Sequence, residues 1–429
     1  MRFVFWLYFF GATAHAQTDI QFWHSMSSLP GGKMADLARQ FNASQREYRV
    51  VPVFKGNYQD SMTAAIAAFR ARRAPDIVQV FDVATATMMA AKGAVKPVHV
   101  LMKEQGIALG KEAFFPAVAN YYADPSGNLV SLPFNVSTTA LYLNRDALKA
   151  VGEDANQPPK TWIEFLRVAE KLKLGGHKCA YTTQCPSCVH IENFAARHDI
   201  PIATRDNGML GLDAVFVFND ALHLRQMTML ADMARRGVFS YSGRLAEADA
   251  RFAAGECAML TSSTSAMGNI RRNARFVPVV ATLPYHEDIA AAPRNLLVGG
   301  ASLWVMSGRP AAHEAGIARF LKFLAEPAQQ AAWHQATGYL PASAAAFEIA
   351  KKAGHYQQNP GADLAVAEFN RPVTANTRGI RFGNFVEGRR VIDEELELMF
   401  VGKKTPKAAL DDAVSRGNAL LRRFEAANR

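Results

Sequence analysis

The stretch DIQFWHSMSSLPGGKMADLARQF, residues 19–41, contains the pattern that decides the fold class. Residues 19–23 alternate between polar and apolar side chains, as a half-buried β-strand does. The apolar side chains that follow recur at helical spacing: Met34, Leu37, Ala38 and Phe41. A strand followed by an amphipathic helix is therefore predicted at the start of the chain.

The same order of elements repeats directly downstream. Residues 48–54 read as a second strand, residues 59–72 as an alanine-rich helix and residues 76–81 as a third short strand. Strands that alternate with helices indicate an α/β unit with a largely parallel sheet. In such sheets ligands bind where loops leave the carboxyl ends of the strands, which is where Tyr58 and Asp82 lie.

A second block of strand and helix begins near residues 132–135 and continues with the apolar residues 140–143. The next helix starts with Thr161 and Glu164 at capping-box spacing, and we expect Trp162 to lie in the core. The second block therefore predicts another α/β unit.

Two later segments allow two interpretations each. The small polar residues 261–265 lie between an apolar strand and a helix, so they either bind an anion through free backbone N–H groups or cap the helix. Gly299 and Gly300 lie between apolar runs, where they permit close approach of a ligand or form a bulge or turn. Tyr339 follows a helix that ends at Gly338, which places it on a loop.

Composition describes a globular chain with material for a packed core, since 49% of the residues are hydrophobic and 10% are aromatic. At roughly 100–200 residues per domain we expect two or three domains, preferably two large ones. The net charge of +10 allows two interpretations: basic residues scattered over a solvated surface, or a field that attracts small anions. On charge alone we favour the first. Basic residues do not gather into a run with interleaved aromatics, so no nucleic-acid partner is expected.

The first 16 residues have the three-part layout of a secretory signal peptide. Arg2 precedes an apolar stretch over residues 3–10, and small residues then end at Ala16, after which cleavage is expected. A membrane-spanning helix needs about 20 apolar residues, so this stretch is too short to span a membrane unless the signal stays uncleaved as an anchor. Loss of Arg2 leaves a net charge of 10 − 1 = +9. The mature protein is predicted to reside in the periplasm.

Four cysteines in an exported chain are expected to form disulfides, because the periplasm is kept oxidising. Three pairings are open, and our preference is Cys179 with Cys257 and Cys185 with Cys188. The Cys185-Pro186-Ser187-Cys188 cluster with the nearby His190 also allows a redox or a zinc site. Against redox chemistry, the cluster lies between two polar stretches, and zinc would need a further ligand from far away.

Catalytic signatures are missing from the sequence. It contains neither a phosphate-binding P-loop nor a G-x-S-x-G nucleophile elbow. His286-Glu287 continues as Asp288-Ile289-Ala290, so an H-E-x-x-H metal motif is absent too. Missing motifs lower the odds of an enzyme without excluding one, because carboxylate pairs leave no local trace in a sequence. Our expectation is a protein that is not an enzyme, with no catalytic residues, no cofactor and no metal.

Six blocks spread over the mature chain resemble the glycerol-3-phosphate-binding proteins of the Ugp importer family, within the extracellular solute-binding proteins of family 1. The blocks are FWHSM (22–26), KGNY (55–58), TATMM (85–89), GGASLWVM (299–306), TGYLP (337–341) and DEELE (393–397). This resemblance implies a type 2 periplasmic binding protein, with two α/β lobes that close on a ligand about a hinge. We place one lobe at residues 17–134 plus 295–341 and the other at residues 135–294 plus 342–429.

The resemblance also implies a set of ligand-binding residues, which match the family's motifs one by one: Tyr58, Asp82, Ser137, Ser263, Gly300, Tyr339 and Arg389. Their chemistry suits a phosphorylated glycerol. The Arg389 guanidinium, the two serine hydroxyls and the Gly300 N–H would bind phosphate oxygens. Asp82 would accept hydrogen bonds from glycerol hydroxyls, because a carboxylate that faces a phosphate repels it.

Two departures from the family pattern concern the ligand. The acidic position is commonly glutamate in the family, and Asp82 is one methylene shorter. Two tryptophans that wall the glycerol end in the family are replaced here by Cys185 and Cys188. A pocket of different shape would favour a glycerophosphodiester or another phosphorylated polyol.

The expected function is therefore capture of glycerol-3-phosphate or a glycerophosphodiester, such as glycerophosphocholine, and its delivery by a monomer to the permease subunits of an ABC importer. An oligosaccharide receptor is the alternative within the binding class. A periplasmic phosphodiester hydrolase is the alternative from another class.

Overall fold

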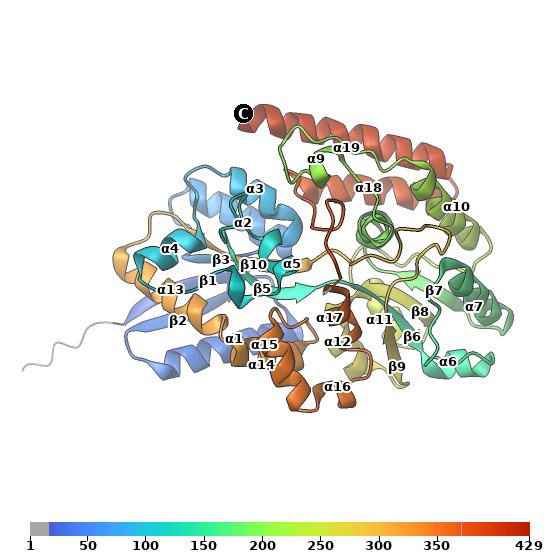
Figure 1. The fold of residues 1–429 in the computed structure, drawn as a ribbon, viewed down its shortest axis with the longest axis horizontal. Coiled ribbons are helices and arrows are strands. Elements are labelled where there is room, and N and C mark those ends of the chain that lie inside the picture. The colour runs from blue at the N-terminus through green and yellow to red at the C-terminus, as the bar shows by residue number, and fades with distance from the viewer. Residues whose placement is uncertain (1–16, 370) are drawn as a thin grey trace, which may run out of the picture.

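The computed structural model describes residues 17–369 and 371–429, so the predicted signal peptide lies outside the described residues. The described chain forms two halves, each built around one β-sheet and covered by helices (Figure 1). The α/β architecture expected from the sequence is confirmed. The residue boundaries of the two lobes stay a prediction.

The sheet of the first half has the order β2-β1-β3-β10-β4, with β5 also paired to β10. Its strands are β1 (Thr18–His24), β2 (Tyr48–Phe54), β3 (Ile77–Phe81), β4 (Val95–Lys96), β5 (Leu132–Ser137) and β10 (Gly299–Met306). β1 is parallel to β2 and β3, as predicted. β10 is antiparallel to β3, β4 and β5, so the prediction of a largely parallel sheet is wrong beyond the first three strands.

Helices cover both faces of this sheet. Phe22 of β1 faces a core that contains side chains of α1 and α13, and Val78 of β3 faces a core that contains Ala65 of α2. The helices of this half are α1 (Ser28–Ser44), α2 (Tyr58–Arg70), α3 (Thr85–Ala90), α4 (Val98–Glu104), α5 (Pro116–Tyr121), α13 (Ala311–Leu324) and α14 (Pro327–Thr337). The short 3-10 helices η1 (Asp82–Ala84) and η2 (Lys111–Ala113) belong to it as well.

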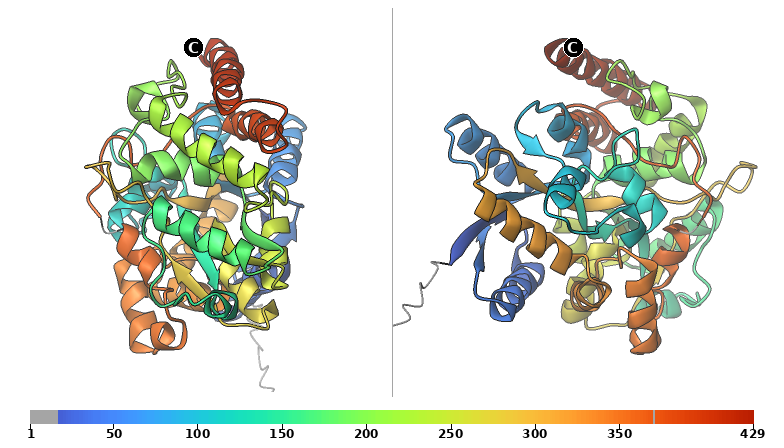
Figure 2. Two further views of the ribbon diagram at one scale, coloured as in Figure 1. Left: turned by 90° about the vertical axis from the view of Figure 1, so that its right-hand side faces the viewer. Right: turned by 60° about the vertical axis from the view of Figure 1, so that its left-hand side comes forward.

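The sheet of the second half has the order β7-β8-β6-β9, in which β7 is parallel to β8 and the other pairs are antiparallel. Its strands are β6 (Thr139–Asn144), β7 (Cys179–Thr183), β8 (Cys257–Ser263) and β9 (Pro278–Ala281). The capping box predicted at Thr161 and Glu164 starts α7 (Trp162–Leu174), and Trp162 is buried as expected. Helix α7 and helix α10 (Ala221–Arg235) lie on the outer side of this half (Figure 2).

Other helices complete the second half and the base of the molecule. They are α6 (Arg145–Ala150), α8 (Phe194–Arg197), α9 (Thr204–Asn207), α11 (Glu247–Ala253), α12 (Met267–Asn273), α15 (Ala344–Lys352), α16 (His355–Gln358), α17 (Leu364–Phe369), α18 (Phe385–Phe400) and α19 (Pro406–Asn428). The π-helix η3 (Cys188–Asn193) and the 3-10 helix η4 (Thr264–Ala266) are short. Helices α18 and α19 pack together, and Leu396 and Leu410 join the core of the second half (Figure 1).

The chain passes directly between the two sheets at the end of β5, because β6 begins two residues later in the other sheet. Thr138 lies at this passage. Its hydroxyl donates to the Leu297 carbonyl oxygen over 2.8 Å, and Leu297 belongs to the return passage from β9 to β10. The two crossing segments therefore brace each other between the halves.

The preferred pairing of the cysteines is confirmed. Cys179 is bonded to Cys257 across the paired strands β7 and β8, and Cys185 is bonded to Cys188 within one loop. The zinc interpretation of the second pair is wrong, because its thiols are consumed by the disulfide and His190 is hydrogen-bonded to the Tyr181 hydroxyl.

Candidate functional site

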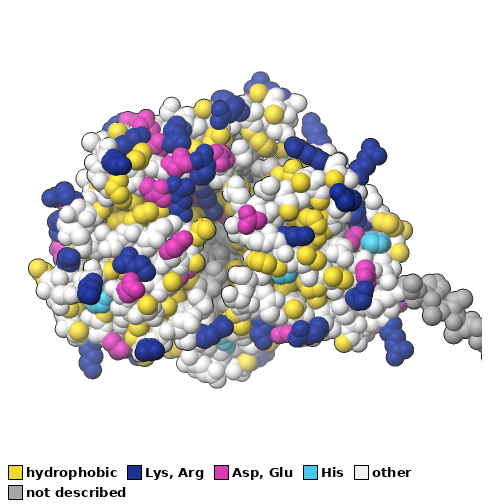
Figure 3. All heavy atoms as spheres, turned by 180° about the vertical axis from the view of Figure 1, so that it is seen from behind, with side chains coloured by type: hydrophobic (Ala, Val, Ile, Leu, Met, Phe, Trp, Pro, Cys, Tyr) yellow, Lys and Arg dark blue, Asp and Glu magenta, His cyan; other side chains and the backbone are white. Residues whose placement is uncertain are grey.

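A cavity of about 800 Å³ opens between the two halves. Figure 3 shows the molecule hollowed between its halves, with Lys and Arg side chains gathered toward the upper end of the hollow. All seven residues predicted to bind a ligand line this cavity: Tyr58, Asp82, Ser137, Ser263, Gly300, Tyr339 and Arg389. They come from segments up to 331 positions apart in the chain (389 − 58 = 331). Their contact with a ligand stays a prediction.

Tyr58 is fixed by the start of helix α2. Asn57 and Asp60 form a capping box there, and the Tyr58 ring stacks on Phe81 with centroids 5.2 Å apart and planes inclined by 6°. The Asn135 side-chain amide donates to the Tyr58 hydroxyl oxygen over 2.9 Å. Sequence reasoning missed Asn135, although it lies in the strand that ends at the cavity.

Tyr339 lies on the loop after helix α14 and lines the same cavity as Tyr58. Helix α14 ends at Gly338, whose φ of 86° is left-handed, and the Tyr339 hydroxyl donates to the Met26 sulfur atom over 3.9 Å. The Leu340 N–H donates to the Val136 carbonyl oxygen over 2.7 Å and holds this loop on β5. Burial raises the pKa of both tyrosines, so they present neutral hydroxyl groups.

Gly300 and Ser137 lie at the crossing between the sheets. Gly299 pairs with Ser137 and Gly300 with Val136 in the β5–β10 ladder, which shifts register after Ala301. The paired glycines therefore begin a strand next to a bulge. Gly300 has a φ of 105°, and a β-carbon there would lie 1.8 Å from the Asn135 carbonyl oxygen. Close backbone packing is the structural reason for a glycine at this position.

Ser263 ends strand β8 and caps the turn that follows. Its hydroxyl oxygen accepts from the Ser265 N–H over 3.2 Å and contacts the Ser265 hydroxyl at 2.8 Å. Of the two interpretations of residues 261–265, capping is present in the structure. Because Ser263 also lines the cavity, anion binding by this segment stays a prediction.

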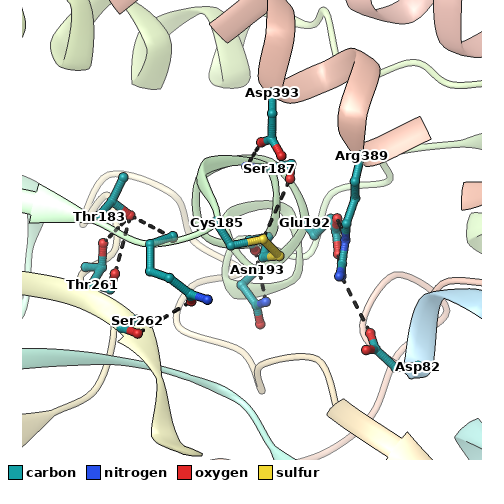
Figure 4. Close-up of a disulfide and its surroundings, with 12 residues drawn as sticks. Asp82, Thr183, Cys185, Ser187, Glu192, Asn193, Thr261, Ser262, Arg389 and Asp393 are labelled. Atoms are coloured by element: carbon teal, nitrogen blue, oxygen red, sulfur yellow. Dashed lines mark hydrogen bonds and ion pairs between the residues drawn. A yellow bond between two sulfur atoms is a disulfide. The ribbon is translucent and has the colours of Figure 1, made fainter. Parts of the chain in front are cut away.

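Arg389 on helix α18 lies in a cluster of three charged side chains. Its Nε and Nη2 donate to the two carboxylate oxygens of Glu192 over 2.7 and 2.6 Å, and Nη2 lies 3.5 Å from Asp82 Oδ2 (Figure 4). Glu192 and Arg389 belong to the second half, whereas Asp82 follows β3 of the first. The cluster therefore bridges the two halves across the cavity.

Sequence reasoning missed Glu192, which changes the charge of the site. Its side chain is 2% exposed, and with Asp82 it gives the cluster two carboxylates for one guanidinium. The only signal was an acidic residue in a mostly apolar segment after the Cys185–Cys188 pair. Among residues 17–369 and 371–429 no acceptor is hydrogen-bonded to Nη1 of Arg389, so this donor is available to a ligand.

Asp82 is a cavity carboxyl group whose pKa its surroundings change. Burial raises its pKa to about 6, against the opposing effect of Arg389, and the nearby Glu192 carboxylate raises it further. The Asp82 carboxyl is therefore poised to take up or release a proton close to neutral pH. Ionisation above that pH costs folding free energy, because the unfolded chain holds this group at an ordinary, lower pKa.

We expect Asp82→Asn to stabilise the protein at pH 8. Below about pH 4 Asp82 is protonated in both the folded and the unfolded wild-type protein. Wild type and variant should therefore unfold at similar temperatures there. As the pH rises through about 6 the wild type alone loses the contribution of Asp82, whereas Asp249 and Asp393, whose pKa burial also raises, titrate in both proteins. The variant should therefore be more stable than wild type at pH 8 by about 1–3 kcal/mol. Thermal unfolding at pH 4 and pH 8 without ligand measures this, with Asp36→Asn, at a half-buried position of helix α1, as control. A variant less stable than wild type at pH 8 would contradict it.

Two sheets joined by crossing segments, with a cavity between them, define a two-lobed solute-binding protein. Residues 36–363 match the family model of the bacterial extracellular solute-binding proteins, and the chain belongs to this family. The sn-glycerol-3-phosphate-binding periplasmic protein UgpB of Pectobacterium atrosepticum is 48% identical over 416 residues, covering 96% of this chain and 94% of the relative. UgpB of Yersinia pseudotuberculosis is 48% identical over 422 residues, covering 98% and 96%.

Solved structures agree with the fold. UgpB of Mycobacterium tuberculosis in complex with glycerophosphocholine superposes with a TM-score of 0.77 at 20% identity, covering 95% of this chain and 99% of that one. The GacH receptor of Streptomyces glaucescens, also solved with acarbose, gives 0.78 at 16% identity, covering 95% and 99%. At such identities the likeness concerns the fold alone.

The predicted resemblance to the Ugp binding proteins is confirmed, and the chain is a periplasmic solute-binding protein and not an enzyme. The hydrolase alternative is thereby set aside. Within the described residues, no helix combines the length and the apolar character that crossing a bilayer requires.

Proposed function

We propose that this protein captures glycerol-3-phosphate or a glycerophosphodiester in the cavity between its halves and delivers it, as a monomer, to the permease of an ABC importer. The observation that carries the proposal is the meeting of donors from both halves around one cavity. Tyr58 and Gly300 come from the first half, and Ser263 and Arg389 come from the second. The near full-length identity to the UgpB relatives supports the same ligand class.

In this proposal the phosphate group lies against the free Nη1 of Arg389 and the hydroxyl groups of the serines. Charge-assisted hydrogen bonds from a guanidinium to phosphate oxygens are short and strong. Asp82 then accepts from the glycerol hydroxyls. Glu192 holds the guanidinium plane through two hydrogen bonds, which orients it before the ligand arrives. Closure of the halves around the ligand would complete the site.

A diester head group also fits the character of the cavity. Its volume of about 800 Å³ lies within the range of small-molecule sites, roughly 300–1,000 Å³. Besides the charged cluster, Arg244 and Arg390 line it together with Glu247 and Asp393, and the two carboxyl groups suit a cationic head group such as choline. We therefore propose that glycerophosphocholine is accommodated as well as glycerol-3-phosphate.

Isothermal titration calorimetry of the purified mature protein tests the ligand class. We expect saturable heat with glycerol-3-phosphate, with glycerophosphocholine or with both, and none with maltose or maltotriose. Binding of the sugars alone would replace the proposal by an oligosaccharide receptor. Absence of heat with all four ligands, from folded protein, would contradict the proposed ligand class.

A further inference from the structure

The two disulfides differ in their access to the cavity. Cys179 and Cys257 are 1% and 0% exposed and lie within the second sheet. Cys185 and Cys188 are only partly buried, and both line the cavity between the halves. A reagent that fits into the cavity can therefore reach the Cys185–Cys188 bond and not the Cys179–Cys257 bond. Access to the sulfur atoms is one of the factors that sets the rate of thiol–disulfide exchange.

The Cys185–Cys188 loop connects a strand to a helix. β7 ends at Thr183, η3 begins at Cys188, and the Val189 N–H donates to the Cys185 carbonyl oxygen over 3.1 Å. Cys185 has a φ of 44°, a left-handed conformation that is unfavourable for a residue with a β-carbon. The covalent bond helps to hold it there.

The loop is tied to the groups that we assign to ligand binding. The Ser187 N–H donates to Asp393 Oδ1 on helix α18 over 3.0 Å (Figure 4). Glu192, four residues after Cys188, holds the Arg389 guanidinium. Asn193 donates to the Cys188 carbonyl oxygen and accepts from the Leu297 N–H of the crossing segment. A rearrangement of the loop would thus reach both Arg389 and the crossing between the halves.

We propose that Cys185–Cys188 is a thiol-exchange site inside the ligand cavity, reduced by small dithiols, and that the oxidised form binds ligand more tightly than the reduced form. A thiolate of the dithiol attacks one sulfur atom and forms a mixed disulfide, while the other cysteine leaves as a thiolate and takes a proton from water. The second thiol of the reductant then displaces the remaining cysteine. The products are two protein thiols and a cyclic oxidised dithiol, so two electrons and two protons are transferred.

Reduction rates test the exchange site without reference to any ligand. The folded protein is exposed to a limiting amount of dithiothreitol, quenched with an alkylating reagent, and each cysteine pair is quantified by peptide mass spectrometry. We expect Cys185–Cys188 to be reduced at least about tenfold faster than Cys179–Cys257, because of these two bonds only Cys185–Cys188 is accessible from the cavity. Equal rates, or faster reduction of the buried pair, would overturn the exchange site.

Calorimetry tests the effect on affinity, which rests on the proposed function. We expect reduced wild type and the double variant C185S/C188S to bind glycerol-3-phosphate or glycerophosphocholine about tenfold more weakly than oxidised wild type, as when one hydrogen bond to a charged group is weakened. Dithiothreitol should not alter the affinity of C185S/C188S. Unchanged affinity after reduction of wild type would overturn the second half of the proposal. If even the oxidised protein binds neither ligand, the proposed function fails while the reduction rates still decide the exchange site.

Discussion

Arg389→Ala is expected to weaken binding of glycerol-3-phosphate or glycerophosphocholine by at least about 30-fold, because loss of one partner from a buried charged contact costs about 2–5 kcal/mol. The side chain projects from α18 into the cavity, and no acceptor within the described part of the chain is hydrogen-bonded to its Nη1 donor. Truncation removes this donor and the only cation in the three-residue cluster. Two carboxylates would then face an anionic ligand.

The same substitution should also destabilise the unliganded protein. Glu192 would remain buried with both of its hydrogen bonds to Arg389 gone, and breaking a buried ion pair from one side costs about 3–5 kcal/mol. Affinity must therefore be measured at a temperature where the variant is folded, as judged by thermal unfolding. Arg389→Lys separates charge from geometry, because lysine keeps the charge and lacks the planar fork of donors.

A matched control for Arg389→Ala is Arg225→Ala. Arg225 forms an exposed ion pair with Asp288, so its removal changes the net charge equally without touching the cavity. We expect the control to bind like wild type and to lose at most about 1 kcal/mol of stability. If Arg389→Ala were folded and bound ligand as well as this control, the ligand would not be recognised through its phosphate.

Local sequence patterns predicted the elements of this protein well. The first three strands and the helices between them, the capping box at Thr161 and the end of α14 at Gly338 all follow from short-range spacing. The direction of strand pairing did not follow. β10 lies more than 200 residues after β3 in the chain, and nothing within its eight residues tells that it pairs antiparallel with β3.

The candidate site could be predicted from the sequence only in part. Single residues such as Gly300 or Ser263 gave signals that a turn or a helix cap would explain equally well. The resemblance to the Ugp family brought seven of them together, and the structure places these around one cavity. Glu192 and Asn135 were not predicted as site residues, because each contacts a partner that is distant in the chain. Glu192 contacts Arg389, and Asn135 contacts Tyr58. Such contacts leave no local period in the sequence.

Gly300→Ala is expected to lower the free energy of unfolding by about 3–5 kcal/mol, in the range reserved for severe steric or backbone disruption. A methyl group at this position would lie 1.8 Å from the Asn135 carbonyl oxygen and 3.4 Å from the Ser137 nitrogen. Because the overlapping atom belongs to the backbone, β5 and β10 must separate where the chain crosses between the halves. Asn135 holds Tyr58, so ligand binding should be lost together with stability.

Gly308 provides the control that separates steric overlap from backbone conformation. It follows the end of the same strand with a φ of 73°, and a β-carbon there meets no other atom within 4 Å. Gly308→Ala should therefore cost only the strain of a left-handed alanine, about 1–2 kcal/mol, and leave affinity unchanged. Urea unfolding followed by tryptophan fluorescence compares the two variants. If both variants lost the same free energy of unfolding, the backbone at the strand crossing would have moved to accommodate the added methyl group. Close packing at Gly300 would then not determine the geometry of the cavity.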